Sequence, residues 1–533
     1  MSLARETGGK APGVLPASLL GGDGMYFQAL EAAEIRAELA EVVPSEGLRG
    51  DYLRALEREH GDMPLSARGG GAYLTLRCDR RGDLEVIVRM GMPEESLGKA
   101  RDLICAIAEE SAWAESPEAP FEDDMHPTVD RMAAETACLF AWAGRTGRLD
   151  ARTEGRLLYE ARRRVFTPLI AHEDYPCLRG AGKNAGAALA NALAAALLLE
   201  TDGARLSALI RRTTRALDEF IDRGGHFSLE EALEDRAAMT EAWRLARKIA
   251  GPSALGRALP KGEWLDEFLM AHLGGGAFLD PLGEGVRGGL NGADLALLGE
   301  AGGDGAVRAL GAQLFRENPA PCSALTARMR GDMGDMTQGA VPRLRHAALP
   351  DFWIMSARGG GMLAAMHGGG RGNAGGICVY LEQTPVLVTF PGDAPVLNGI
   401  RQAESPGAGD CSFGDARADM SMDMTALYPG SGVRFYQRTL MLDRTEGIAR
   451  LIDIVESETQ GAIRYAFVTP YAPARLGNSA RMGIGLLTWE GGPAASTRRA
   501  PGEGAFPDGL YLVELEYPLT PGSNYINFVI ERA

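Results

Sequence analysis

Residues 103–113 read LICAIAEESAW, and residues 127–136 read PTVDRMAAET. In the first stretch, Leu103, Ile104 and Ile107 recur at the three- and four-residue spacing of a helix that is buried along one side. Similar stretches lie at 132–143, 157–169, 187–199, 206–221, 237–249 and 263–273. Loops rich in glycine and proline separate them, so this part of the chain is predicted to form antiparallel helix pairs arranged in a ring or solenoid.

The pattern changes near residue 335, where short runs of alternating apolar and polar residues begin. A two-residue period rich in β-branched residues is typical of strands in an antiparallel sheet. The predicted strands are 352–355, 377–381, 385–390, 433–442, 448–455, 463–469, 509–517 and 525–531. Turn residues between them favour a β-sandwich.

One β-hairpin is predicted within the helical part, at 72–89, because two apolar runs flank Arg81, Gly82 and Asp83. The whole pattern divides the chain into an N-terminal tail (1–24), a helical domain (25–335) and a β-sandwich domain (336–533).

The charge balance and the termini limit the class of partner. The 533 residues include 55 basic and 71 acidic side chains, for a formal net charge of −16. Nucleic acids and anionic membranes repel such a chain unless it carries a basic patch, so neither is an expected partner. Residues 1–20 do not resemble a signal peptide, and the longest apolar run, 185–199, is too short to span a bilayer. We therefore expect a cytoplasmic protein.

Metal and phosphate sites are not expected. The seven cysteines form no C-x-x-C pair, and the seven histidines fit no zinc-binding spacing. The glycine clusters at 359–361 and 368–372 lack the strand–loop–helix context of a phosphate-binding loop. They are predicted to be ordinary loops between strands, and no cofactor is predicted.

Three polar motifs each have two interpretations. His367, in a glycine-rich loop, is either a solvated loop residue or a general acid/base. The carboxylates within 230–235 are predicted to form an acidic first helical turn with Ser228 as N-cap, since glycoside hydrolysis needs carboxylates across a cleft. Asp130 and Glu135 are expected to be solvated or to pair along their helix.

Taken together, these stretches resemble the heparinase II/III-like polysaccharide lyases. Residues 103–113 and 127–136 are similar to that family's I-x-E-E-x-x-W … P-T-x-D-L-F-A-A-E-T. Residues 159–168 (YEARRRVFTP) resemble Y-E-I-x-R-R-I-F-x-P, and residues 373–388 (NAGGICVYLEQTPVLV) resemble H-N-D-x-G-N-F-x-V-Y-x-D-G-x-P-V-L-I-D. The likeness continues through Pro395–Gly399 and Val433–Leu440. It implies an incomplete (α/α) toroid followed by an antiparallel β-sandwich, in agreement with the periodicity.

The resemblance also implies a chemistry. The family cleaves uronate-linked glycans by β-elimination: a base removes the proton from the carbon that bears the carboxylate, and the glycosidic oxygen leaves. The carboxylate must be neutralised, usually by Asn or His, to stabilise the developing enolate. A Tyr acts as base and acid, assisted by a His. An acidic oligosaccharide or polysaccharide is thus the expected partner, and a homodimer is left open.

The family's catalytic motifs are only partly matched. Its Asn falls on Lys183 or Asn184, without the Trp that follows it in the family. The positions of its Tyr and of the following Trp carry Leu233 and Glu234, neither of which acts as a base in the way that Tyr does. The motifs are therefore degenerate at the base.

The family's histidine-rich loop and metal ligand are also altered. The loop is shortened to the run from His367 through Arg371 to Asn373. The Asp that is often a metal ligand is replaced by Thr389, and a later histidine by Gly392, so metal binding of the family type is not expected.

Two functions follow as hypotheses. In the first, the protein is a lyase in which Asn184 or Lys183 neutralises the carboxylate, His367 transfers the proton, and Tyr175 or another nearby Tyr replaces the missing base. In the second, it is a glycan-binding or interaction protein without turnover. The residues predicted to contact substrate under either hypothesis are Arg371, Asn373, Glu110 and Trp113.

Overall fold

The structure is a computed structural model of the chain. It describes residues 26–27, 30–31, 33–61, 71–115, 128–172, 175–180, 184–223, 229–251, 272–274, 277–279, 286–287, 291–302, 305–317, 323–330, 344–349, 354–368, 374–389, 394–403, 408–500 and 509–533. The chain divides into two compact units. A helical unit comprises residues 20–261 and 291–339, and a sheet unit includes residues 262–290 and 340–533.

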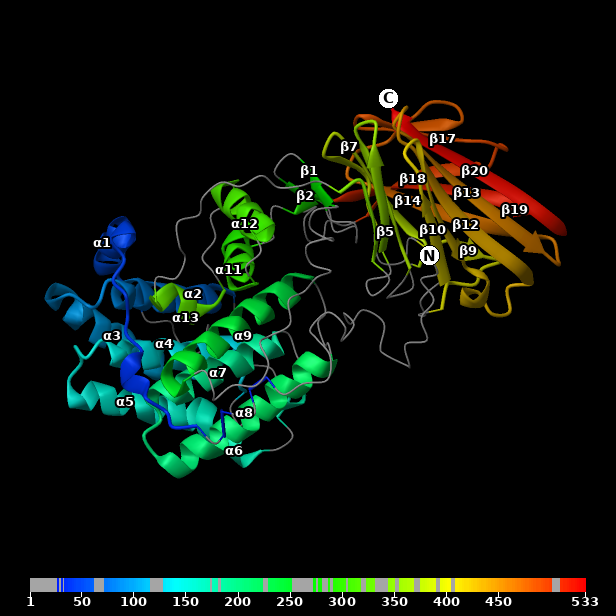
Figure 1. The fold of residues 1–533 in the computed structure, drawn as a ribbon. Helices are drawn as coiled ribbons and strands as arrows, with labels where there is room; N and C mark the ends of the chain where they lie inside the picture. Colours follow the sequence, from blue (N-terminus) through cyan, green and yellow to red (C-terminus); the bar gives the residue numbers. More distant parts are fainter. Residues whose placement is uncertain are drawn as a thin grey trace. The chain divides into compact units, whose positions relative to one another are not determined.

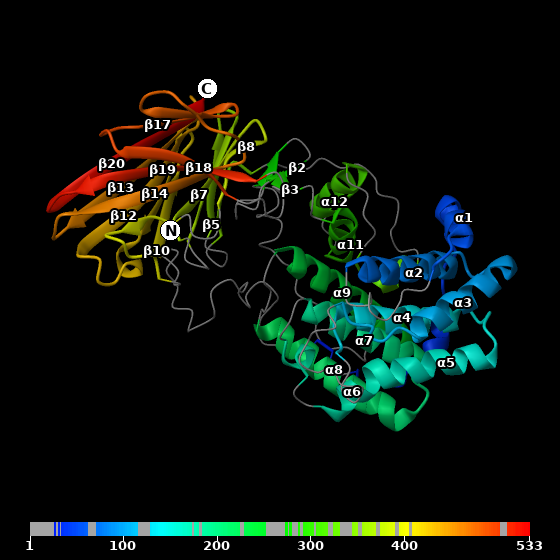
Figure 2. The same cartoon turned by 180° about the vertical axis from the view of Figure 1, so that it is seen from behind.

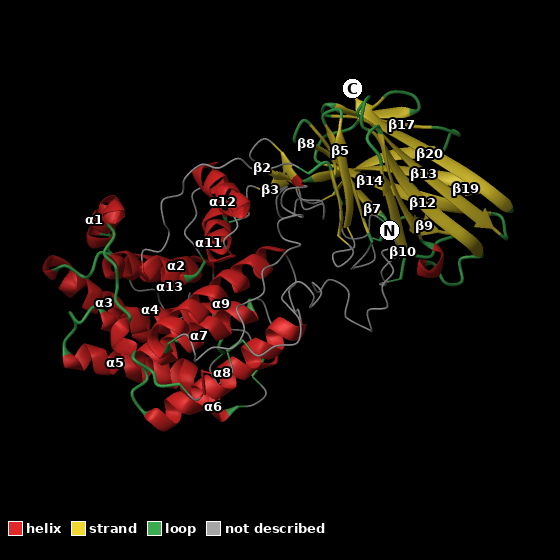
Figure 3. Cartoon of the chain, in the orientation of Figure 1, coloured by secondary structure: helices red, strands yellow, loops and turns green. Residues whose placement is uncertain are grey.

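The described part of the helical unit is built mainly from α-helices (Figures 1 and 3). They are α1 (Arg49–Glu57), α2 (Gly71–Arg89), α3 (Leu97–Ala108), α4 (Arg131–Arg145), α5 (Ala151–Ala161), α6 (Thr167–Ala171), α7 (Ala185–Leu199), α8 (Gly203–Arg223), α9 (Leu229–Ala250), α11 (Gly292–Gly302), α12 (Gly305–Glu317) and α13 (Leu325–Arg330). The prediction of a helical N-terminal region is confirmed.

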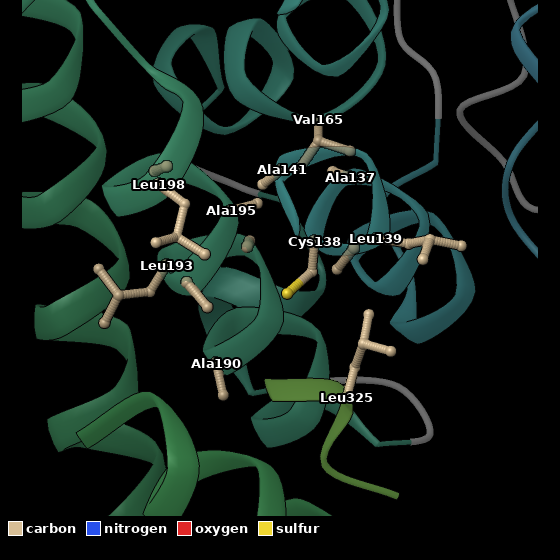
Figure 4. Packing of buried hydrophobic residues seen from close by; sticks show 14 of the residues in the cluster. Ala137, Cys138, Leu139, Ala141, Val165, Ala190, Leu193, Ala195, Leu198 and Leu325 are labelled. Carbon is tan, nitrogen blue, oxygen red and sulfur yellow. The ribbon is translucent and has the colours of Figure 1, made fainter. Parts of the chain in front are cut away.

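Helix α7 forms the centre of this unit's core. Its sequence is almost entirely alanine and leucine, and every residue from Ala185 to Leu198 is buried. A helix that is apolar all round must be covered on all sides. Helices α4, α8 and α9 pack against it, and Figure 4 shows side chains of this core from α4, such as Cys138, and from α7, such as Leu193 and Ala195.

The hairpin predicted at 72–89 is wrong, because these residues form helix α2. The buried side chains of α2 are Tyr73, Arg77, Arg80, Asp83, Leu84, Ile87 and Val88. Their spacing is that of one helical face. Two of them are arginines, however, so a search for apolar residues at helical spacing does not detect this face. Arg77 is only 2% exposed because its guanidinium donates to Glu110 and to the Ala114 carbonyl oxygen, which lies at 2.7 Å.

The sheet unit is built from antiparallel strands (Figures 2 and 3). The eight-stranded sheet has the order β10 (Ala408–Phe413), β11 (Arg417–Asp423), β12 (Val433–Asp443), β13 (Ile448–Ser457), β20 (Gly522–Arg532), β17 (Gly485–Trp489), β16 (Ser479–Met482), β15 (Ala474–Arg475). The five-stranded sheet runs β4 (His346–Leu349), β5 (Ile354–Gly359), β6 (Met362–His367), β7 (Gly376–Leu381), β8 (Thr384–Leu387). The four-stranded sheet runs β18 (Ala494–Ala500), β19 (Leu510–Leu519), β14 (Gly461–Thr469), β9 (Val396–Leu397).

One continuous apolar core joins the inner faces of these three sheets. Met366 of β6, Phe528 of β20 and Leu515 of β19 all belong to it. On β12 and β13 buried residues alternate strictly with partly exposed ones over most of their length, as expected for a sheet with one covered face. The predicted β-sandwich is confirmed.

A smaller sheet lies in the segment that returns to the sheet unit. Strands β1 (Leu273–Gly274), β2 (Ala277–Leu279) and β3 (Val286–Arg287) pair in that order. A helix was predicted at 263–273. Residues 263–271 lie outside the described residues, and Leu273 belongs to β1. The sequence analysis predicted two contiguous domains, 25–335 and 336–533. In the structure, residues 262–290 belong to the same compact unit as residues 340–533.

The first glycine cluster forms the turn between β5 and β6. Gly360 and Gly361 have φ of 54° and 76°, the conformation of a two-residue hairpin turn that favours glycine at both positions. A side chain at Gly360 would also meet the backbone of the β12–β13 turn, since its Cβ would lie 2.4 Å from Gly447 N. The predicted loop is confirmed, and its glycines are required by geometry.

Replacing Gly360 by Ala should therefore destabilise the protein more than replacing Gly361. We expect Gly361→Ala to cost about 1 kcal/mol, because only the positive φ is unfavourable there. Gly360→Ala adds a backbone overlap and should cost about 2–5 kcal/mol in total. Urea unfolding of both variants measures the difference, and equal midpoints would contradict the close approach.

A buried polar group lies inside the sandwich. Asp453 of β13 is fully buried and faces Arg438 of β12, which donates to it from Nε at 3.0 Å and from Nη2 at 2.8 Å. Tyr436 donates its hydroxyl to the same carboxylate at 2.7 Å, and burial raises the pKa of this phenol so that it keeps its proton. Arg438 also donates to the carbonyl oxygen of Gly375 at 2.9 Å. Every charge in this group is thus matched by hydrogen bonds.

Candidate functional site

The start of helix α7 has an unusual construction. Asn184 occupies the N-cap position in the left-handed conformation, with φ 54° and ψ 39°, and its side chain does not cap the helix. The capping oxygen comes instead from Asp235 of α9, whose Oδ1 accepts the N–H of Ala187 at 2.7 Å. The Asn184 amide is therefore available for another contact.

That contact is with Glu234, on which two donors converge. Asn184 Nδ2 and Arg131 Nη1, from the start of α4, both donate to Glu234 Oε2. Arg131 Nε also donates to Glu135 Oε1 at 2.8 Å. We call Asn184, Arg131, Glu234 and Glu135 the Asn184 cluster. Its Asn is 3% exposed, whereas the side chains of Arg131 and Glu234 keep 30% and 28% of their surface, so the cluster opens to solvent.

Electrostatics tune the two charged partners differently. Burial raises the pKa of the Glu234 carboxyl above its ordinary value, although Arg131 and Asn184 act in the opposite direction. Burial alone would lower the pKa of Arg131, but Glu135 and Glu234 outweigh it and raise the value. The arginine thus stays charged, while the carboxyl becomes easier to protonate than an ordinary Glu.

Asn184 and His367 each have one buried side-chain atom that lacks a hydrogen-bond partner in the described part of the chain. These atoms are Asn184 Oδ1 and His367 Nε2. Buried polar atoms are nearly always paired, so exceptions are candidates for contact with a ligand or water. Asn184 belongs to the helical unit and His367 to the sheet unit.

The prediction that His367 lies in a loop is wrong. It is the last residue of β6 and pairs with Ile354 on one side and Gly376 on the other. The run Met362–His367 contains two alanines and no β-branched residue, which hid the strand. His367 is 4% exposed, and burial lowers its pKa to about 4, so the imidazole is neutral at physiological pH.

The structure gives no support to Tyr175 as the base. Its side chain is 2% exposed, and burial raises the pKa of its phenol above the ordinary value, which disfavours the ionised form. Leu233, at the position of the family's Tyr, is a core residue. Lys183, Arg371 and Asn373 lie outside the described residues.

Glu110 and Trp113 support the helical unit rather than face a ligand. Glu110 is 3% exposed and accepts from Arg77 at 3.3 Å and from Arg81 at 2.7 Å. Trp113 is 2% exposed, donates to the Ile107 carbonyl oxygen at 2.9 Å and meets the Phe140 ring edge-on at 5.1 Å. Their predicted contact with substrate does not fit this burial.

The predictions for Asp130, for Glu135 and for the carboxylates at 230–235 concern the starts of helices α4 and α9. Asp130 is the N-cap of α4 and accepts the N–H of Ala133 at 3.0 Å, and Glu135 pairs with Arg131, so both follow their helix as expected. Helix α9 starts at Leu229, in agreement with the predicted helix start, although Ser228 lies outside the described residues. Glu234 and Asp235, however, contact the start of α7 and are more than a solvated first turn.

Sequence reasoning missed Arg131 and Glu234 as site residues. Arg131 directly follows Asp130 in the quoted motif, and Glu234 stands where the family has Trp. Both residues therefore belong to segments that were compared with the family, but neither was assigned a role. Their pairing joins residues far apart in the chain, and no local pattern reports such a contact. Three similarly sized acidic residues within 230–234 gave no reason to single out one of them.

Comparison with known proteins identifies the fold. No protein-family model matches the sequence, and no curated protein is similar to it. Among solved structures, a mutant of the heparan sulfate lyase HepC from Pedobacter heparinus matches with a TM-score of 0.56 at 11% identity, over 95% of this chain and 87% of that one. A mutant of the chondroitin AC lyase from Streptomyces coelicolor A3 matches with a TM-score of 0.53 at 12% identity, over 95% and 82%. The chain therefore has a polysaccharide lyase fold.

Two negative findings apply to the described part of the chain. None of its helices is both long and apolar enough to cross a membrane. No group of three or more His, Cys, Asp or Glu side chains there is placed to hold a metal ion.

Proposed function

We propose that the protein acts on uronate-containing glycans and cleaves them by β-elimination, with the Asn184 cluster as the centre of its site. The proposal is supported by the polysaccharide lyase fold and, above all, by one observation: Arg131 and Asn184 converge on a single carboxylate oxygen. In this state Glu234 fills a position that is suited to a substrate carboxylate.

Binding of substrate then uses donors that are already in place. When a uronate enters, its carboxylate replaces Glu234 between Arg131 and Asn184. The guanidinium and the amide neutralise the negative charge that spreads onto the carboxylate as the adjacent carbon loses its proton. An Arg is always protonated, so this neutralisation does not depend on pH in the working range.

The displaced Glu234 is our candidate for the base. Its carboxylate takes the proton from the carbon next to the uronate carboxylate, and the electron pair left behind forms a carbon–carbon double bond. The bond from the neighbouring carbon to the glycosidic oxygen breaks, and this oxygen receives the proton back from Glu234. His367, neutral and with an unpartnered Nε2, is retained as a proposed contact to the glycan rather than as the base.

A direct assay tests this proposal. The product carries a conjugated double bond, so incubation with heparan sulfate, chondroitin sulfate and xanthan should raise ultraviolet absorbance for at least one of them. Glu234→Gln should lower kcat by about 10²–10⁴-fold, the usual contribution of a positioned base, while binding is kept. A rise that is unchanged by Glu234→Gln would exclude Glu234 as the base.

The pH profile provides a second test of the same residue. A base must be ionised, so kcat/KM should fall as the pH drops through the Glu234 pKa, which lies above 4.5. His367→Ala should leave this acid limb in place, because the His367 pKa of about 4 lies below it. A limb that moves in His367→Ala would assign it to the histidine instead.

Binding without turnover is the second candidate function. It is favoured by Leu233, a core residue at the position of the family's Tyr, and by the burial of Tyr175 and His367, the residues predicted to replace and assist that base. Binding of these glycans without any rise in absorbance would establish this function. Absence of both binding and cleavage would overturn the proposal as a whole.

A further inference from the structure

The sheet unit contains a second polar pocket of about 720 Å³, well within the size range of small-molecule sites. It lies at the end of the four-stranded sheet, where β14 begins and β9 meets it. The lining residues are Val396, Asn398, Gly399, Gly430, Ser431, Gly432, Thr459, Gln460, Gly461, Ala462, Arg464 and Glu516. The proposed function makes no use of this pocket.

The floor of the pocket is held in one conformation by Asn398. This residue has a left-handed φ of 50°, and its side-chain amide bridges the loop at Ser431 and the start of β14. Nδ2 donates to the Ser431 carbonyl oxygen at 2.6 Å, while Oδ1 accepts the N–H of Ala462 at 2.8 Å. A side chain at Gly461 would overlap Asn398, because its Cβ would lie 1.9 Å from Oδ1. The pocket is therefore formed before any ligand arrives.

Its polar groups are left open for a ligand. Ser431 is only 4% exposed, and its hydroxyl oxygen has no hydrogen-bond partner in the described part of the chain. Arg464 is exposed, and its side chain forms no ion pair or hydrogen bond with another described residue, although Glu516 lies directly opposite it on β19. A buried hydroxyl without a partner is uncommon, so Ser431 is a candidate for contact with a ligand or water.

The chemistry of the lining selects one class of ligand. No aromatic side chain is among the lining residues, so a neutral sugar has no ring on which to stack. Glycines at 399, 430 and 432 let a ring approach the backbone closely. Arg464 can bind a carboxylate or sulfate through two parallel hydrogen bonds, and Ser431, Thr459, Gln460 and Glu516 can bind hydroxyl groups.

We propose that this pocket is an accessory binding site for one acidic sugar unit of a glycan. It would hold the glycan without taking part in cleavage. The proposal rests on the proposed function only for the class of ligand; the pocket itself is defined by residues that the lyase chemistry does not use.

The test suppresses turnover at the Asn184 cluster and measures binding by the pocket. The full-length Asn184→Gly variant is titrated calorimetrically with tetrasaccharides of heparan sulfate, chondroitin sulfate and xanthan. At least one should bind, and adding Arg464→Ala should weaken the binding that the pocket contributes about tenfold or more, as loss of a charge-assisted pair does. Adding Gln460→Trp, which fills the opening, should abolish this contribution.

A matched control is available on β13. Arg450 is an exposed arginine that does not line the pocket, and Arg450→Ala should leave the titration unchanged. If no tetrasaccharide binds Asn184→Gly, or if Arg464→Ala changes the affinity less than twofold, the accessory site is excluded. If the lyase proposal is wrong, the unaltered protein will not cleave any of these glycans. The titrations measure binding and do not depend on cleavage, so the two proposals can fail separately.

Discussion

Asn184→Gly is expected to lower kcat/KM for the cleaved glycan by about 10²–10³-fold, the range seen when one donor to a developing anion is removed. Glycine adopts the left-handed conformation of Asn184 without strain, so the start of α7 should be preserved while the amide is lost. Initial rates of absorbance increase measure the effect.

Two companion variants separate catalysis from folding. Asn184→Ala should lose as much activity and should also lower the free energy of unfolding by about 1 kcal/mol, because Ala disfavours a positive φ. Arg131→Lys keeps the charge but not the forked geometry, and should raise KM more than Asn184→Gly does. If Asn184→Gly retains activity, carboxylate neutralisation does not occur at this residue.

The largest effect on stability is expected for Asp453→Ala. The change leaves Arg438 buried, charged and without its partner, which typically costs about 3–5 kcal/mol. Tyr436 also loses the acceptor of its hydroxyl. Chemical unfolding followed by tryptophan fluorescence should show the transition at much lower denaturant, or no folded sandwich at all.

The control for this prediction lies on the same pair of strands. Arg434 and Glu456 form an exposed ion pair between β12 and β13, so Glu456→Ala should leave the unfolding midpoint unchanged. Replacing both buried partners, as Arg438→Met with Asp453→Leu, should recover much of the loss because no isolated charge remains. A small effect of Asp453→Ala would mean that water reaches Arg438.

Much of the fold could be predicted from the sequence, because helices and strands with one covered face carry their period in the order of residues. The runs at 433–442 and 448–455 coincide almost completely with β12 and β13. The prediction failed where packing overrides the pattern. Helix α2 buries Arg77 and Arg80, and β6 consists of methionine, leucine and alanine before a buried histidine.

The candidate site was predictable only in part. Asn184 was given a role through the family resemblance, and His367 was already a possible general acid/base from its sequence context; each has an unpartnered buried atom in the structure. Glu234 was seen as one of several acidic residues in a helical turn, since its contact with Arg131 depends on how α4 and α9 pack. Glu110 and Trp113 belong to the motif that identifies the fold, and their burial explains why they are tied to folding rather than to a ligand.

The allocation of residues 262–290 to the sheet unit affects any attempt to dissect the protein. A fragment that starts at residue 340 would lack part of its own unit, and the complementary fragment would carry that part without its partners. Isolated halves are therefore poor reagents for deciding which unit binds a glycan. Hybrids that exchange the sandwich with another lyase need matched junctions near 261, 290 and 339, not a single crossover.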